Sequence, residues 1–181
     1  VSLDANSSWT AAGQLVEAGI GPRLTTLIGD RTYIEAFVKA RRERYLGQDF
    51  NLWDTGGFLG VNPTSRLFVG LGGGAGPQID YYDVDPYLGF EALLMLVAEG
   101  SLWGRLRVNY GGTAWTFLDQ PGGERVYSTL INRVDGTVFM TSELSLRLIL
   151  EHNSWEQTFT SNALLAWRLN HGTAAYLGYQ E

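Results

Sequence analysis

The stretch from Thr141 to Glu181 contains three segments whose side chains alternate, and this alternation constrains the fold more than any other feature. In the segment 144–152, leucine occupies every second position from 144 to 150. Because successive side chains of a strand point to opposite faces, a period of two predicts β-strands. The same period predicts strands over 158–168 and 173–180, joined by a turn around Asn170-His171-Gly172.

The length of these segments favours a membrane barrel. A strand of about 9–11 residues, tilted by about 45°, crosses the hydrocarbon layer of a bilayer. An aromatic near a strand end, such as Trp167 or Tyr179, suits the girdle where a ring lies half in lipid and half in water. One wall of a soluble β-sandwich would show the same alternation, so the pattern alone leaves both architectures open.

The composition narrows the class of protein. The 181 residues are expected to form one domain, 1–181. A net charge of −6 argues against nucleic-acid binding, which needs clustered Lys and Arg. The chain has no cysteine, 23 glycines and no apolar run of the roughly 18 residues that a spanning helix needs. Val1 is followed at once by polar residues and not by a signal-peptide pattern, so we expect a mature, trimmed or partial chain.

Strand patterns and turn signals alternate along the whole chain, and no convincing helix is found. About nine to eleven strands are expected in all. Besides the three C-terminal segments, strands are expected over 8–18, 23–28, 32–42, 50–61, 66–74, 86–98, 102–110, 113–118 and 125–139.

The predicted turns differ in length. Short ones (62–65, 99–101, 141–143 and 170–172) tend to alternate with longer polar or glycine-rich ones (72–80, 119–124 and 153–157), although Gly111-Gly112 is short where a long loop is due. Outer-membrane barrels place short turns on the periplasmic side and longer loops outside. The alternation therefore favours the barrel over the sandwich.

The C-terminal residues also resemble a known family. The runs Glu143–Leu150, Asn162–Trp167 and Gly172–Tyr179 are similar to the C-terminal region of large bacterial proteins of uncharacterised function, in which a carbohydrate-binding-family-9-like domain precedes a predicted outer-membrane β-barrel. The resemblance covers about the last 40 residues of this sequence. It implies an outer-membrane barrel and no particular activity. The chain lacks that N-terminal domain, is shorter than a whole barrel region, and ends Tyr179-Gln180-Glu181 instead of on a terminal aromatic.

Motifs that carry chemistry are few. Gly70–Ala75 formally fits a phosphate loop, but Gly76-Pro77 denies the following helix that such a loop needs, so a flexible loop or a close-packed glycine strand is expected. The sequence offers no histidine pair and no nucleophile motif, so we expect neither catalysis nor a cofactor. The one weak metal candidate is the acidic segment Asp80, Asp83 and Asp85, where a solvated loop is the better interpretation.

Charges inside predicted strands are more informative. An Arg or Lys facing lipid at the bilayer midplane costs about 2–4 kcal/mol, so in a barrel such charges should point inward. We expect a mixed-sign ladder of ion pairs in the lumen, and in a sandwich the same residues would form the solvated face. The ladder comprises Glu35, Lys39, Arg41, Glu91, Arg105, Arg107, Arg147, Glu151 and Arg168.

The aromatic residues have two interpretations. They could form a sugar-stacking surface, with Trp155 in its polar loop as the residue to test. We favour interfacial girdles, because several lie near predicted strand ends. The girdle residues are Trp53, Trp103, Trp115, Trp167 and Tyr179.

Together these patterns predict an all-β, antiparallel up-and-down barrel of about eight to ten strands, of the outer-membrane type. The expected function is non-enzymatic: a structural, anchoring or narrow-pore role in the bacterial outer membrane, with the lipid bilayer or detergent as partner. A lumen of that size is largely filled by side chains. The alternative is a secreted, extracellular β-sheet protein that binds glycans or self-assembles into homo-oligomers or fibres through open sheet edges.

Overall fold

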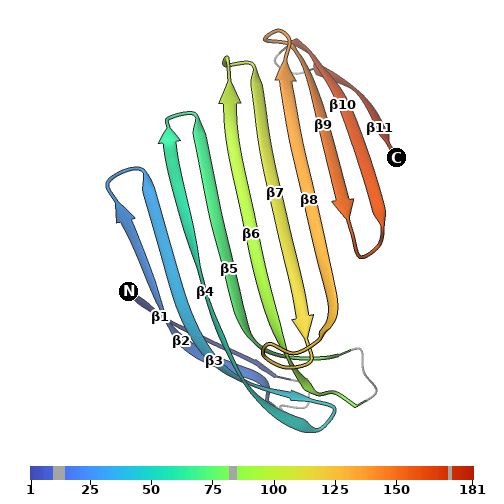
Figure 1. Cartoon of the computed structure of the whole chain (residues 1–181). Helices are drawn as coiled ribbons and strands as arrows, with labels where there is room; N and C mark the ends of the chain where they lie inside the picture. The colour runs from blue at the N-terminus through green and yellow to red at the C-terminus, as the bar shows by residue number, and fades with distance from the viewer. Residues whose placement is uncertain (10–14, 82–84, 171–172) are drawn as a thin grey trace. The chain divides into compact units, whose positions relative to one another are not determined.

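A computed structural model describes residues 1–9, 15–81, 85–170 and 173–181 of the chain. Within these ranges every regular element is a β-strand (Figure 1). The strands are β1 (Ser2–Trp9), β2 (Leu15–Ile28), β3 (Thr32–Tyr45), β4 (Gln48–Thr64), β5 (Leu67–Ile79), β6 (Leu88–Leu102), β7 (Leu106–Leu118), β8 (Arg125–Phe139), β9 (Leu144–Asn153), β10 (Thr158–Asn170) and β11 (Thr173–Gln180).

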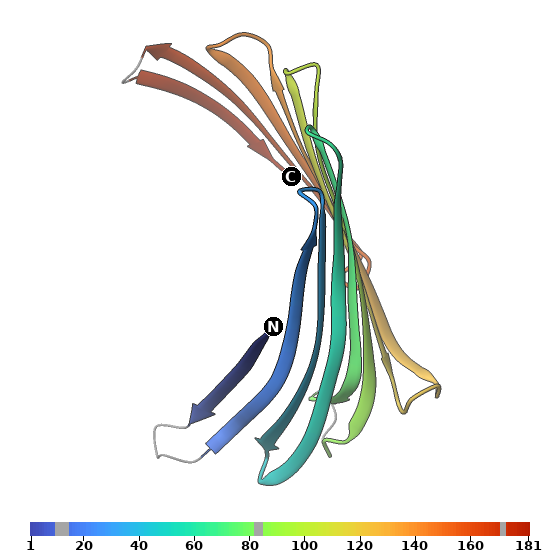
Figure 2. The same cartoon turned by 90° about the vertical axis from the view of Figure 1, so that its left-hand side faces the viewer.

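The eleven strands form one sheet in sequence order, from β1 to β11, as an antiparallel meander. Each strand hydrogen-bonds to its neighbours in the chain, and the antiparallel pair β10 and β11 can be followed by its red colour in Figure 2. In the sheet order given by the described residues, β1 pairs with β2 alone and β11 with β10 alone. The predicted all-β, antiparallel meander is confirmed, and the eleven described strands match the nine to eleven expected along the chain, one more than the eight to ten expected for the barrel.

None of the described segments is a helix long and apolar enough to cross a membrane.

The chain divides into two compact units. The first unit comprises Val1–Gly60, Gly72–Leu94 and Trp115–Ser128, and the second comprises Val61–Leu71, Met95–Ala114 and Thr129–Glu181. Strands β1 to β3 belong wholly to the first unit and β9 to β11 wholly to the second. Each unit is therefore described by itself below.

The buried apolar side chains that the structure describes are few, and all lie in the first unit. Phe50, Leu52 and Ile79 form one small cluster, with Tyr45 packed against it. Phe117 is fully buried and stacks on Tyr127, with ring centroids 5.1 Å apart and planes 2° from parallel. Apolar side chains elsewhere in the described chain are therefore half-buried or exposed.

Two predicted turns were wrong because glycine or proline was taken as the turn signal. Residues 99–101 belong to β6, and the turn that follows is 103–105, where Trp103 and Gly104 take the left-handed φ values of 51° and 65° that a tight turn requires. Residues 62–64 belong to β4, which carries Pro63 close to its end, and the connection is only 65–66. The strand expected from Leu102 begins at Leu106 instead.

Two other glycine-rich stretches expected to be loops lie inside strands. Gly72 to Ile79 continue β5, so of the two interpretations given for Gly70–Ala75 the close-packed glycine strand is confirmed: a Cβ on Gly73 would lie 2.6 Å from the Leu93 carbonyl oxygen. Gly111-Gly112 lies inside β7, where the ring of Tyr110 occupies the space that a Cβ on Gly112 would need. The segments expected over 102–110 and 113–118 are therefore one strand.

The remaining strand predictions agree better with the structure. The segment 125–139 coincides with β8, and 144–152 and 158–168 fall one and two residues short of β9 and β10. At the other end of the chain, β1 begins at Ser2 where no strand was expected. The predicted strand 8–18 and the predicted turn 170–172 extend partly outside the described residues, at 10–14 and at 171–172.

The connections retain part of the predicted length pattern. In a meander, alternate connections lie at opposite ends of the strands. Those after β2, β4, β6 and β8 are short, at 29–31, 65–66, 103–105 and 140–143. The longest ones follow β5 and β7, at 80–87 and 119–124, whereas 46–47 after β3 is a short exception.

Candidate functional site

The two faces of the first unit differ sharply in chemistry, as the register of β1, β2 and β3 shows. Ile20 lies opposite Ala40 and also opposite Ala5, and Leu24 lies opposite Ala36. Residues directly opposite each other in neighbouring strands point to the same face. We call this the apolar face, and its large side chains are exposed: Leu3, Ile20, Leu24, Ile28 and Val38.

The alternate positions of the same strands form the polar face. Glu35 lies opposite Thr25, Arg41 opposite Gly19, and Glu43 opposite Glu17. These side chains are shielded more than the apolar ones. Arg41 and Glu43 are each only 13 % exposed, whereas Val38 on the apolar face is 53 % exposed.

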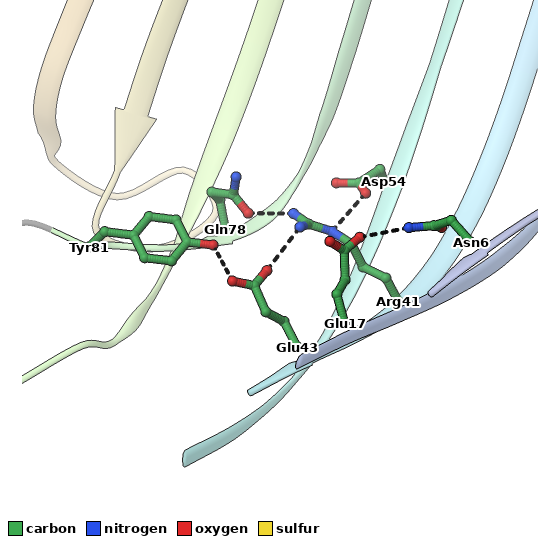
Figure 3. A network of polar contacts seen from close by, with 7 residues as sticks. All are labelled: Asn6, Glu17, Arg41, Glu43, Asp54, Gln78 and Tyr81. Carbon is green, nitrogen blue, oxygen red and sulfur yellow. Dashed lines mark hydrogen bonds and ion pairs between the residues drawn. The ribbon is translucent and has the colours of Figure 1, made fainter. Parts of the chain in front are cut away.

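Arg41 is the hub of a network on this polar face (Figure 3). Its Nε donates to Asp54 Oδ2 at 3.0 Å, its Nη1 donates to Glu43 Oε2 at 3.1 Å, and its Nη2 donates to Gln78 Oε1. One guanidinium thus links β3, β4 and β5. Because its donors end on three different side chains, the network fixes the alignment of the three strands.

Tyr81, in the connection after β5, extends the network. Its hydroxyl donates to Glu43 Oε1 at 2.6 Å, and its ring meets Tyr45 edge-on at 4.9 Å. Burial, together with the hydrogen bond to the Glu43 carboxylate, raises the pKa of Tyr81, so the phenol stays protonated at neutral pH.

A second cluster on the polar face surrounds Arg23. Its Nε donates to Asp4 Oδ2 at 2.6 Å, its Nη1 donates to Glu35, and its guanidinium carbon lies 5.2 Å from the centre of the Phe37 ring. Tyr33 also donates to Glu35, at 2.6 Å. Strands β1, β2 and β3 are therefore joined by charge pairs on this face alone.

Between β4, β5 and β6 the polar face is hollowed by a cavity of about 150 Å³. Asp54, Gln78 and Glu91 give it polar walls, Phe37 and Leu93 give it apolar ones, and Gly74 and Gly76 contribute no side chain. A Cβ on Gly74 would already lie 3.0 Å from the Thr55 carbonyl oxygen, so the glycine strand is needed for this close approach. The space suits a few water molecules or a small ion more than an extended ligand.

The second unit repeats the division into two faces. Val138, Leu146, Leu165 and Leu177 form one row across β8 to β11, which is entirely apolar. At the alternate positions, Arg133 Nη1 donates to Glu151 Oε2 at 2.9 Å. The Asp135 carboxylate likewise accepts from Arg147, whose Nε donates at 3.0 Å. Here ion pairs occupy one face and exposed aliphatic side chains the other, whereas in the first unit Arg42 and Arg44 also pair with Asp49 at the end of the apolar face.

The predicted ladder residues fall into four groups. Glu35 and Arg41 of β3, and Arg147 and Glu151 of β9, lie in ion pairs, while Glu91 lines the cavity. Lys39, Arg107 and Arg168 lie in strands without an ion pair to another described residue. Arg105 was expected in a strand and instead lies in the turn 103–105.

Sequence reasoning missed most of the partners. Asp4, Arg23 and Asp54 complete the ion pairs of the first unit, as Arg133 and Asp135 do in the second. All of them sit at the polar positions of a period-two pattern. That period would have shown their face but not which residues lie opposite one another.

The predicted aromatic residues occupy different places. Trp53, Trp167 and Tyr179 are exposed; Trp167 lies opposite Leu144 and Ala175, on the apolar face of the second unit. Trp103 is 82 % exposed at the tip of its turn, whereas Trp115 is half-buried in β7.

The weak metal candidate gains no support from the described part of the chain. Asp80 is buried and its backbone N–H donates to the Tyr87 carbonyl at 2.9 Å, whereas Asp85 is exposed. Asp83 lies outside the described residues. Among the residues that the structure describes, no group of three or more His, Asp or Glu is placed to hold a metal ion.

Comparisons with protein-family models, with curated proteins and with solved structures gave no match to this chain.

Proposed function

We propose that this chain is part or all of a non-enzymatic outer-membrane β-barrel, with a structural, anchoring or narrow-pore role. The observation that carries the proposal is an exposed apolar face opposite a polar face whose charges are paired and, around Arg41, also shielded. A protein folded in water covers its apolar face and exposes its charges. A hydrocarbon solvent reverses this preference, and a barrel meets it on the outside.

The extent of the apolar face supports the same proposal. Exposed aliphatic side chains recur in both units, including Leu24 and Val38 in the first and Val134, Leu148 and Leu177 in the second. Burial of apolar surface is worth about 25 cal/mol per Å². If these side chains remained in water, the protein would lose this free energy of burial on most of its strands.

Strand lengths and connections are consistent with a bilayer. Strands of 13–17 residues, such as β4 and β10, exceed the roughly 9–11 residues that cross the hydrocarbon layer. The short connections after β2, β4, β6 and β8 match periplasmic turns, and the longer ones at 80–87 and 119–124 match external loops. The resemblance of the C-terminal runs to a bacterial barrel region agrees with this assignment.

The proposal is tested by the partition of the purified protein between buffer and detergent or lipid vesicles, together with its mobility on a gel before and after heating. We expect recovery in detergent or vesicles and a compact band that shifts on heating. Tryptophan quenching by brominated lipid would then report Trp167 at the bilayer. A monomer that stays in buffer and ignores vesicles would refute the proposal.

A second candidate is a secreted β-sheet protein that binds glycans. The observation that favours it is Trp155, which is 60 % exposed in the turn between β9 and β10. Its backbone N–H donates to Asn153 Oδ1 at 3.0 Å, an arrangement that steadies the loop carrying the ring. Saccharide-dependent quenching that is lost in Trp155→Ala, in a protein that remains in buffer, would favour this candidate.

A further inference from the structure

Four arginines of the second unit, Arg66, Arg105, Arg107 and Arg168, make no ion pair with a described residue, and two of these four lie together at one hollow. Arg66 and Arg107 both line this hollow, which has a volume of about 450 Å³. The hollow lies where β4, β5, β6 and β7 approach the connections 65–66 and 103–105. Its volume falls in the range of small-molecule sites, roughly 300–1,000 Å³.

The other walls of the hollow supply neutral hydrogen-bond donors. They include the hydroxyls of Ser65 and Ser101 and the amide of Asn62. The backbone is held in place there, because Ser101 N–H donates to the Arg66 carbonyl at 2.9 Å. Two guanidinium groups and three neutral hydrogen-bond donors thus line the same hollow.

One carboxylate also borders the hollow. Glu99 lines it, yet it lies beyond 4.0 Å from the nitrogens of both arginines, since it forms no ion pair with either. The side chains around the hollow therefore carry a net charge of +1, from two arginines and one glutamate. An anion bound between the arginines would be opposed by Glu99.

We propose that this hollow binds the phosphate group of a small soluble molecule. Phosphate has more oxygens than a carboxylate and can accept from two guanidinium forks and neighbouring hydroxyls at once. A free solute fits better than a lipid headgroup. Glu99 and Ser101 alternate along β6 with Gly100 and the exposed Leu102, so these two polar side chains of the hollow lie on the face opposite Leu102.

The proposal is tested on the whole chain with inorganic phosphate as probe, by calorimetric titration or by ³¹P line broadening. We expect Arg66→Gln and Arg107→Gln each to weaken phosphate binding about tenfold. The matched control is Arg105→Gln, which removes the same charge from the neighbouring turn outside the hollow and should leave binding unchanged. Glu99→Gln should strengthen binding about threefold, which a purely structural role of these residues would not produce.

Three results would overturn the proposal: no phosphate binding by the wild type, equal loss in all three arginine variants, or acetate binding as tight as phosphate. Displacement of phosphate by vesicles of phosphatidylglycerol, but not by glycerol phosphate, would assign the site to lipid and overturn the soluble ligand. The titration needs no vesicles, so failure of the barrel proposal and failure of this one are separate results.

Discussion

The two faces of β9 differ in chemistry, although their side chains are exposed to a similar extent. On one face Leu144, Leu146, Leu148 and Leu150 follow one another, and Leu148 is 43 % exposed. On the other, Arg147 and Glu151 reach across to the carboxylate of Asp135 and the guanidinium of Arg133. The difference teaches that paired charges connect β8 and β9 on one face of the sheet, whereas the other face offers aliphatic side chains alone.

The largest effect is expected when an arginine is introduced on each face of β9 in turn, at two adjacent positions. Leu148→Arg places a charge on the apolar face, midway along β9, and should destabilise the vesicle-inserted protein by about 2–4 kcal/mol. Ile149→Arg is the matched control, because position 149 lies opposite Asp135 on the polar face and should cost less than about 1 kcal/mol. Urea titration from vesicles measures both, and equal costs would contradict the assignment of the faces.

A second test compares a shielded ion pair with an exposed one. Arg41→Met leaves Asp54 and Glu43 without their common cation at a site where Arg41 is 13 % exposed, and should cost about 2–3 kcal/mol. Arg147→Met breaks a pair whose arginine is 47 % exposed and should cost distinctly less. Urea midpoints of the two variants, measured under the same conditions, test this order; the reverse order would show that Arg41 is not the hub.

The third test compares two glycines. A Cβ on Gly76 would collide with the Trp53 carbonyl oxygen, so Gly76→Ala should cost about 1–3 kcal/mol through overpacking. A Cβ on Gly136 of β8 meets nothing within 4 Å, so Gly136→Ala should be neutral or slightly stabilising. Thermal unfolding of both variants measures this difference in stability. If alanine were tolerated at position 76, β4 and β5 would have to lie farther apart than described.

The smallest effect concerns pH. Hydrogen bonds from Ser142 and then Thr141 lower the pKa of Glu143, in the connection before β9. A lowered folded pKa contributes stability above the unfolded value, about 4.3, and this contribution is lost as the pH falls through the folded pKa. Glu143→Gln should therefore be slightly less stable than the wild type at pH 7 and equal to it near pH 3. A difference that persists at low pH would show that the charge is not involved.

The fold could be predicted from the sequence where side chains alternate, and less well where glycines cluster. The leucines of 144–150 have one structural meaning, and β8 to β11 were predicted to within two residues. Gly100 and Gly112 are each compatible with two structures, because glycine is favoured in tight turns and also in strands whose backbone lies close to a neighbour. Only the neighbouring strand, which the sequence pattern does not reveal, decides between them.

The candidate site shows the same limit. The period of two along β3 placed Glu35, Lys39 and Arg41 on one face. It could not identify Asp54 and Gln78 as partners of Arg41. These residues lie 13 and 37 positions after Arg41 in the chain, and their contacts with it depend on the register of β4 and β5. The period of the sequence predicts the face to which a side chain points, but only the register of the strands determines which side chains meet.

The glycine-rich strand β5 has a consequence for how the sheet assembles. A strand with few side chains carries little information about its own alignment and can slide by two residues without exposing a new surface. In β5 that information is concentrated at the end, where Gln78 accepts from Arg41 and Ile79 joins Phe50 and Leu52. The side chains of these two residues therefore specify the alignment of β5 with β3 and β4, which its glycine-rich middle does not.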